Sequence, residues 1–170
     1  MSALPGFSHE SQNAKTVEWY TPPWVFEALG LSFDLDPCSP PGGLPWVPAV
    51  SHYSAADNGL IKEWRGRVWL NPPYGDLTSK FLARMHEHRH GVALVFARTD
   101  TNWFHNYAAK ADAILFIHGR LAFVPSGEIK GKSGAGAGSA LIAWNDDCVS
   151  ALRKMMGCGL FWERDKRGET

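Results

Sequence analysis

The sequence predicts a compact, three-layer α/β domain, in which a mostly parallel sheet lies between helices and has an antiparallel edge. Strand and helix patterns alternate through the middle of the chain, while the carboxyl-terminal third is richer in strands. The chain has 170 residues, of which 45% are hydrophobic and 20% charged, as expected for one globular domain. We therefore expect a loose tail over residues 1–15 and a single domain over residues 16–170.

The first helix is predicted at residues 24–29. Thr21 is a suitable N-cap, and Pro22 and Pro23 suit a first helical turn. Gly30 can end the helix. The elements that follow are an alternating strand at 31–36, a loop rich in proline and glycine at 38–48, a short strand at 52–54, a helical turn at 60–64 and a strand at 68–70.

Apolar residues at helical spacing predict the next helix, which begins near Leu77 and ends at Gly91. A continuous apolar run at 92–96 is typical of a buried strand. The remaining predicted elements are a helix at 101–110, strands at 113–117, 121–124, 140–144 and 160–162, a loop at 126–139 and a helix at 148–156.

Charge and cysteine content limit the classes of protein. Seventeen basic residues balance seventeen acidic ones, so any binding to nucleic acid must rely on a local patch. Cys38, Cys148 and Cys158 form no C-x-x-C pair, which favours reduced intracellular thiols over a disulfide framework. The sequence has neither a signal-like apolar run nor a stretch long enough to span a membrane. We therefore expect a cytoplasmic protein with no membrane partner.

The most informative motif is the turn Asn71-Pro72-Pro73-Tyr74-Gly75, which follows the apolar run at 68–70. The side-chain oxygen of Asn71 and the carbonyl of Pro72 are acceptors for an amino group, and two prolines stiffen the turn. Tyr74 offers a flat face on which a base can stack, a contact worth about 1–3 kcal/mol. These residues predict a pocket for an amino group on a planar ring. A Pro-Pro turn without a ligand would have the same sequence.

Three polar residues follow predicted strands. Asp36, Asn71 and Arg98 fall at or just beyond strand ends, where ligands bind in parallel α/β sheets. One cleft can therefore contain all three. A carboxylate at the position of Asp36 suits a ligand ammonium or sulfonium, although an aspartate before a proline also caps turns.

The ordered set of motifs resembles the small phage and prophage DNA N6-adenine methyltransferases related to Dam. The resemblance extends from Glu18 to about Trp144. Its carriers are Glu18-Trp19-Tyr20-Thr21-Pro22, Asp34-Leu35-Asp36-Pro37-Cys38-Ser39, Asp57-Asn58-Gly59-Leu60, Trp64, Asn71-Pro72-Pro73-Tyr74-Gly75, Arg98-Thr99-Asp100-Thr101, Trp103-Phe104, Gly119-Arg120 and Phe123.

This resemblance implies a Rossmann-like methyltransferase fold and transfer of a methyl group from S-adenosylmethionine to the N6 atom of adenine in DNA, in a bacterial host cell. The implied catalytic residues are Asn71, Pro72, Pro73 and Tyr74. The implied cofactor-binding residues are Tyr20, Thr21, Pro22, Asp36, Pro37, Cys38 and Asp57.

The sequence departs from the family pattern after Asp36, where the usual glycine-rich loop is replaced by Pro37-Cys38-Ser39-Pro40-Pro41-Gly42-Gly43. Only 35 positions separate Asp36 from Asn71. We therefore expect the first helix or the second strand of the usual fold to be shortened or missing.

DNA contacts are expected from Arg98 and Arg120, which follow apolar strands, and from Lys130 and Lys132 in the loop at 126–139. A plain linker explains that loop equally well, and the arginines also suit ordinary ion pairs with Asp100 or Asp112.

A histidine run at His86, His88 and His90 is interpreted as a solvated basic face, because no carboxylate or cysteine beside it completes a metal site. We therefore predict no metal.

Other functions remain open. The same tetrapeptide suits methylation of RNA adenine or protein glutamine, and a non-catalytic nucleic-acid-binding relic is a further alternative.

Overall fold

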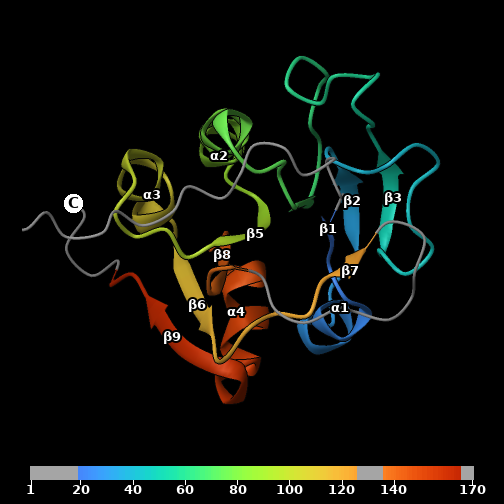
Figure 1. Ribbon diagram of the computed structural model, residues 1–170. Helices are drawn as coiled ribbons and strands as arrows, with labels where there is room; N and C mark the ends of the chain where they lie inside the picture. Colours follow the sequence, from blue (N-terminus) through green and yellow to red (C-terminus); the bar gives the residue numbers. More distant parts are fainter. Residues whose placement is uncertain (1–18, 126–135, 166–170) are drawn as a thin grey trace, which may run out of the picture.

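The computed structural model describes residues 19–125 and 136–165 (Figure 1), so the predicted tail at 1–15 lies outside the described residues. In chain order the elements are β1 (Trp19–Tyr20), α1 (Pro23–Leu29), β2 (Phe33–Asp36), β3 (Ala49–His52), β4 (Val68–Leu70), α2 (Asp76–His88), β5 (Gly91–Phe96), α3 (Asn102–Asn106), a 3-10 helix (Ala108–Lys110), β6 (Ala113–Ile117), β7 (Val124–Pro125), β8 (Ser139–Trp144), α4 (Asp146–Lys154), a second 3-10 helix (Met156–Cys158) and β9 (Gly159–Glu163).

The main sheet has seven strands in the order β3-β2-β4-β5-β8-β6-β9. Strands β3, β2, β4 and β5 are parallel, whereas β8 is antiparallel to both β5 and β6, and β9 is antiparallel to β6. The predicted mixed α/β class is confirmed, and its antiparallel edge contains three strands. β1 and β7 form a separate small sheet.

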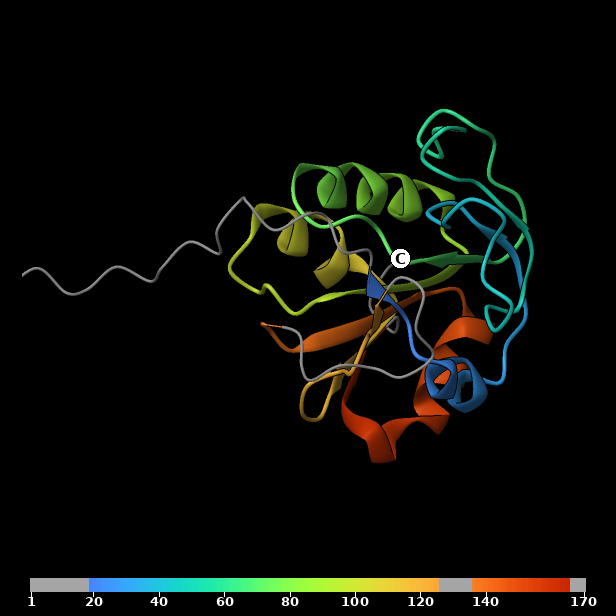
Figure 2. The same ribbon diagram turned by 45° about the vertical axis from the view of Figure 1, so that its right-hand side comes forward.

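Helices cover both faces of the main sheet, with α2 and α3 on one side and α1 and α4 on the other (Figures 1 and 2). Both faces of the sheet are apolar and need a covering layer, as strand β5 illustrates. Its side chains alternate between the two faces. Val92 and Leu94 pack in the core cluster that includes residues of α1 and α4. Ala93 and Val95 pack with residues of α2 and α3. Burying a side chain such as Leu94 stabilises the fold by about 1.5–3 kcal/mol.

Helix α2 forms as the apolar spacing predicts, with Phe81, Leu82 and Met85 buried. The prediction that this helix ends at Gly91 is wrong. The helix stops at His88 because Arg89 adopts a left-handed conformation (φ 62°) and donates its backbone N–H to the carbonyl of Met85.

The N-cap predicted at Thr21 is wrong. Pro22 occupies the N-cap position of α1 without a side-chain hydrogen bond, and Pro23 is the first helical residue. Thr21 lies one residue too early, and its side chain is buried instead.

Two other expected elements are also absent from the described residues. Residues 60–64 form turns and irregular chain, not a helical turn, and residues 121–123 are not a strand. Only Val124–Pro125 is extended there, and it pairs with β1 outside the main sheet.

The expected shortening of the fold lies between β2 and β4. The described chain there contains one strand, β3, and no helix. β3 pairs in parallel with β2, but at Ala49–His52, earlier than the predicted 52–54. The connection over 37–48 contains only turns and irregular chain. Its many prolines and glycines explain why no helix forms.

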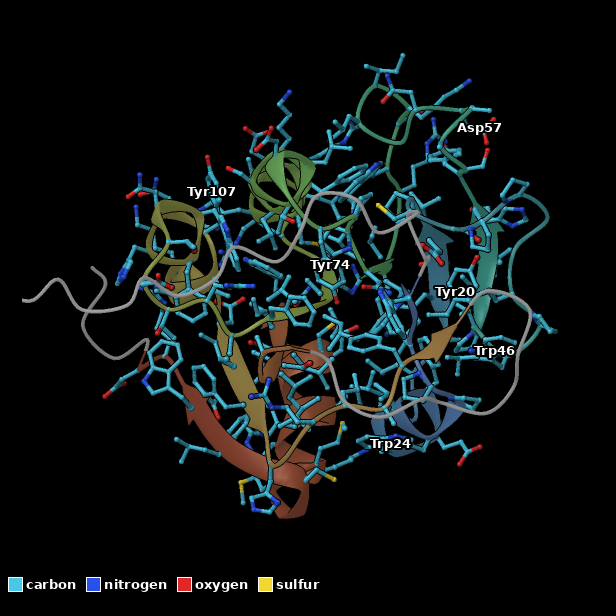
Figure 3. All side chains as sticks on the ribbon, in the orientation of Figure 1. Tyr20, Trp24, Trp46, Asp57, Tyr74 and Tyr107 are labelled. Carbon is cyan, nitrogen blue, oxygen red and sulfur yellow. The ribbon has the colours of Figure 1, made fainter. Side chains whose placement is uncertain are left out.

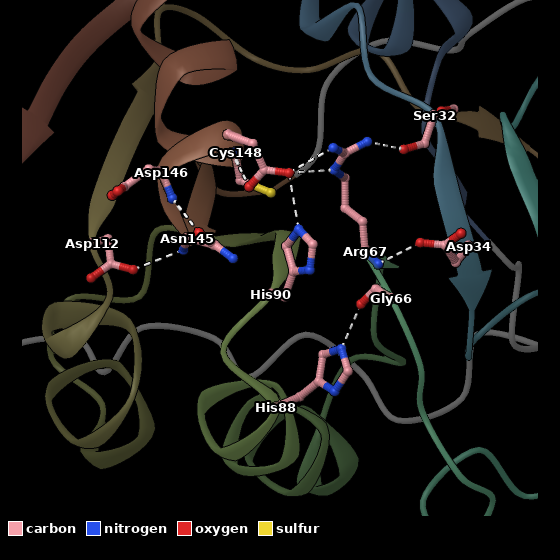
Figure 4. Close-up of polar contacts among 11 residues, drawn as sticks. Ser32, Asp34, Gly66, Arg67, His88, His90, Asp112, Asn145, Asp146 and Cys148 are labelled. Carbon is pink, nitrogen blue, oxygen red and sulfur yellow. Dashed lines mark hydrogen bonds and ion pairs between the residues drawn. The ribbon is translucent and has the colours of Figure 1, made fainter.

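A polar network joins the amino ends of β4 and β5 to the start of α4 (Figure 4). One carboxylate oxygen of Asp147 accepts hydrogen bonds from Arg67 Nε and Nη2 at 2.8 and 2.6 Å, and lies 2.9 Å from His90 Nε2. Arg67 Nη1 also donates to the carbonyl of Ser32 at 2.7 Å. Burial alone would raise the pKa of Asp147, but its bonds to His90 and Arg67 outweigh burial and hold the pKa well below its usual range.

The predicted solvated histidine face is therefore wrong, since His86 Nδ1 is also buried, with no hydrogen-bond partner among the described residues. His90 contacts Asp147, and His88 Nε2 lies 2.7 Å from the carbonyl of Gly66. His90, Asp147 and Cys148 bring three potential metal ligands within 4.8 Å of one another. Arg67 on the same carboxylate supplies positive charge that opposes a cation there. The absence of a metal stays a prediction.

None of the helices in the described residues is long and apolar enough to cross a membrane.

We predict that Asp147→Ala lowers the free energy of unfolding by about 2 kcal/mol, because three charge-assisted hydrogen bonds are lost. Denaturant unfolding measures this loss. The control is Asp76→Ala, which removes an acidic side chain from the first turn of α2 and is expected to cost less than about 1 kcal/mol. Equal losses in both variants would contradict the network's role.

Candidate active site

Polar residues gather where three parallel strands end. β2, β4 and β5 are neighbours, with Leu35 opposite Val68 and Leu70 opposite Ala93, so their carboxyl ends lie at one edge of the sheet. Asp36 ends β2, and Asn71 immediately follows β4. Arg98 lies two residues beyond β5. The structure thus brings these three predicted site residues to the same edge.

Asn71 is oriented by the segment before α1. Its side-chain Nδ2 donates a hydrogen bond to the carbonyl of Trp19 at 3.1 Å. This bond fixes the amide so that Oδ1 faces away from that carbonyl as an acceptor. No described residue donates a hydrogen bond to Asn71 Oδ1 or to the carbonyl of Pro72. Two acceptors from consecutive residues are thus available to an amino group.

The turn that carries these acceptors is anchored to α2. Thr78 Oγ1 donates to the carbonyl of Pro73 at 2.8 Å, and the Thr78 N–H donates to the carbonyl of Gly75 at 3.1 Å. Gly75 has φ +99°, a conformation that glycine adopts without strain. The motif is therefore tied to the first turn of the helix that follows it.

Tyr74 lies near the centre of the view in Figure 3 and stacks on Phe96. The ring centroids are 4.0 Å apart and the planes differ by 8°. Phe123 meets Phe96 edge-on, at 6.2 Å and 86°. Burial raises the pKa of the Tyr74 hydroxyl well above its usual range, while 36% of the residue surface stays exposed. Tyr74 is thus a neutral aromatic platform.

Asp36 is a buried carboxyl group, with 5% of its surface exposed. Burial raises its pKa to about 7, although the hydrogen bond from the Cys38 N–H at 3.0 Å acts in the opposite direction. A cationic ligand next to Asp36 would stabilise the carboxylate and lower this pKa again. The site therefore suits an ammonium or sulfonium group.

Thr21 provides a second buried polar group. Its carbonyl accepts a hydrogen bond from Trp46 Nε1 at 2.9 Å, whereas its buried Oγ1 has no partner among the described residues. A buried hydroxyl without a partner costs about 1–3 kcal/mol, so a ligand that bonds to it gains affinity. Tyr20, which Figure 3 shows between Tyr74 and Trp46, pairs with Val124 through β1 and β7.

Asp57 is held apart from this group by its own loop. Its carboxylate accepts hydrogen bonds from the backbone and side chain of Ser54, at 2.8 and 2.7 Å, and these bonds lower its pKa. The side chain is exposed at the periphery in Figure 3. At the neighbouring Gly59, an added Cβ would clash with the carbonyl oxygen of Pro37, so the loop passes close to Pro37 at that point. Cofactor contact by Asp57 stays a prediction.

The basic residues expected to touch DNA are partly described. Arg98 is exposed, and its guanidinium carbon lies 6.0 Å from the Phe96 ring. Arg120 is exposed beyond β6, which runs in the same sense as β5 because both are antiparallel to β8. Lys130 and Lys132 lie outside the described residues. Of the suggested alternative partners, Asp112 forms an ion pair with Arg89.

Sequence reasoning missed three residues near this edge. Phe96 was assigned only to a buried strand, Trp46 only to a loop, and Ser139 to the end of a loop. Ser139 lies opposite Phe96 in the β5–β8 pairing and has a buried hydroxyl with no partner among the described residues. A period-two strand pattern gives no sign that such a hydroxyl would be left without a partner.

The described residues fit a ligand with two chemically different ends. The buried Asp36 carboxyl and the Thr21 hydroxyl suit a polar, cationic group. The acceptors of Asn71 and Pro72, with the ring of Tyr74, suit a planar ring that bears an amino group. Because Asp36 and Asn71 share one edge of the sheet, the arrangement can bring a cationic donor next to a planar amine.

Comparison with known protein families gives a match. The sequence model of the family described as DNA N-6-adenine-methyltransferase (Dam) matches residues 8–154. Neither a curated protein nor a solved structure matches the chain.

We predict that Asp36→Asn changes how stability depends on pH. The folded pKa of about 7 lies above the unfolded value, so wild-type stability from this group falls as pH rises from about 4 to 7. The free energy of unfolding of wild type should therefore fall relative to the variant by about 3 kcal/mol between pH 5 and pH 8. Denaturant unfolding at both pH values measures it, and a difference independent of pH would contradict the assignment.

Proposed function

Since the chain belongs to the DNA N-6-adenine-methyltransferase (Dam) family, we propose that it transfers a methyl group from S-adenosylmethionine to the N6 atom of adenine in DNA. The observation that carries the proposal is the pair of acceptors at Asn71 and Pro72, which receive no hydrogen bond from the described residues and lie at the same sheet edge as Asp36. The resemblance to phage and prophage enzymes supports action on DNA inside a bacterial cell.

S-adenosylmethionine would supply an electrophilic methyl group on a sulfonium. Thr21 Oγ1 would bond to the polar end of the cofactor, and the Asp36 carboxylate would face its positive charge. The order of parallel strands, with the site beyond their carboxyl ends, supports a Rossmann-like methyltransferase fold.

Asn71 and Pro72 would act on the adenine amino group. Its lone pair is delocalised into the ring, which makes the nitrogen a weak nucleophile. When Asn71 Oδ1 and the Pro72 carbonyl accept hydrogen bonds from the two N–H groups, they would draw this pair back to the nitrogen. The nitrogen would then bond to the methyl carbon while the bond from that carbon to the cofactor sulfur breaks, which leaves S-adenosylhomocysteine, and the methylated nitrogen would lose one proton to water. Positioning and fixed acceptors would supply most of the rate enhancement.

The base must leave the duplex to reach this edge, or come from a single strand, because N6 is paired within double-stranded DNA. Extrusion costs a few kcal/mol. Stacking on Tyr74 offsets about 1–3 kcal/mol of this cost. Arg98, which is exposed, would contact a phosphate of the same strand.

The direct test is to incubate the protein with labelled S-adenosylmethionine and DNA that lacks adenine methylation, then digest the DNA and look for N6-methyladenine. RNA and protein substrates in the same reaction test the alternative acceptors. Folded protein that binds S-adenosylhomocysteine yet forms no N6-methyladenine in DNA would refute the proposal.

We predict that Asn71→Ala lowers kcat at least about 100-fold, since removing one preorganised hydrogen-bonding group at a reacting centre has such an effect. Thermal stabilisation by S-adenosylhomocysteine should be retained, because Asn71 acts on the acceptor base. The control is Asn106→Ala at the exposed end of α3, which should keep wild-type activity. If Asn71→Ala loses cofactor binding together with activity, Asn71 belongs to the cofactor pocket and does not act on the acceptor base.

Cofactor affinity should depend on pH through Asp36. The ionised form binds an ammonium group, which S-adenosylhomocysteine carries at its amino-acid end, so affinity for this ligand should rise on the order of tenfold from pH 6 to pH 8, across the pKa of about 7. Isothermal titration calorimetry measures this rise. Asp36→Asn should bind weakly with little pH dependence, and a wild-type-like pH profile in that variant would exclude Asp36 as the responsible group.

A further inference from the structure

The ring of Tyr74 has one face already covered. Phe96 stacks on it nearly parallel, with 4.0 Å between centroids. Among the described aromatic residues, Phe96 is the one whose ring contacts the ring of Tyr74. The two side chains come from the ends of neighbouring strands, since β4 and β5 pair in parallel. Because Phe96 covers one face, a planar ligand that stacks on Tyr74 without displacing Phe96 has to use the opposite face.

Phe96 is more firmly held than Tyr74. It is the last residue of β5, lies opposite Ser139 in the sheet and is partly buried against the core. Phe123, which is only 2% exposed, contacts the Phe96 ring edge-on. Tyr74 lies in the irregular segment between β4 and α2, and 36% of its surface is exposed. The position of the Tyr74 ring thus depends on Phe96.

To admit a base between them, the two rings would have to be separated by twice the contact distance of stacked carbon atoms, which is about 3.5–4.0 Å. The observed 4.0 Å separation leaves no such space. Separating the pair would require movement of the Tyr74 ring or of its turn, which Thr78 ties to α2. Stacking on the outer face of Tyr74 requires neither change.

We propose that Phe96 is a positioning residue for the methyl acceptor: it fixes the plane of the Tyr74 ring, so that adenine stacks on the outer face with its amino group at Asn71. This proposal rests on the proposed function. Phe96 acts through Tyr74, so removing its ring should misplace the base and leave the cofactor pocket unchanged.

The test compares Phe96→Leu, which keeps an apolar side chain and removes the ring, with Phe96→Tyr, which keeps the ring. Steady-state methyl transfer to unmethylated DNA should show kcat at least about tenfold lower in Phe96→Leu and near wild type in Phe96→Tyr, because orientation of reactants governs the rate. The KM for S-adenosylmethionine should change less than twofold. The matched control is Phe116→Leu, a partly buried phenylalanine of β6 that stacks on Phe104.

A double-mutant cycle separates positioning from direct contact. In a Tyr74→Ala background, Phe96→Leu should lower kcat less than twofold further. An equal loss of kcat in both backgrounds would show that Phe96 contacts the base directly and would overturn the proposal, as would wild-type kcat in Phe96→Leu.

Thermal stabilisation by S-adenosylhomocysteine shows whether each variant is folded. If Phe96→Leu loses it, Phe96→Met replaces that variant in the same cycle. A wild-type protein without DNA methylation would refute the proposed function itself, whatever the variants do.

Discussion

The parallel pairing of β2, β4 and β5 is the constraint on which the site depends. Each strand is short, and the residues that matter follow at its carboxyl end. Because the three strands run in the same direction and are neighbours, Asp36, Asn71 and Arg98 share one edge despite their separation in the sequence. The helices on both faces stabilise this alignment through alternate side chains such as those of β5. The loss of a helix between β2 and β3 leaves the alignment intact.

The two ends of these strands have opposite polar character. At the amino ends, Asp147 bonds to Arg67 and His90, so its charge is compensated and stabilises the fold. At the carboxyl ends, Asp36 is buried with a raised pKa and Thr21 Oγ1 lacks a partner among the described residues. These groups destabilise the free protein, and a bound ligand would compensate them. Such local costs are typical of functional sites.

The sequence predicted the elements that depend on local patterns. The apolar spacing in α2 and the continuous apolar run in β5 were sufficient, and strand ends placed Asn71 correctly. Contacts between distant residues were not predictable: Asp147 reaches His90 across 57 positions, so the histidine run was misinterpreted. Likewise, nothing in the sequence indicated that Phe96 would stack on Tyr74 or that Thr21 would be buried instead of capping α1. These features depend on strand order and packing.

We propose that one edge of the sheet holds both the methyl donor and the adenine amino group. The decisive experiment is a crystal structure of the full chain with S-adenosylhomocysteine. We expect the amino-acid end of the ligand within hydrogen-bond distance of Asp36 or Thr21, and its sulfur directed toward Asn71 Oδ1. A ligand bound elsewhere, such as in the groove between Trp64 and α2, or a sulfur directed away from Asn71, would rule out this shared site.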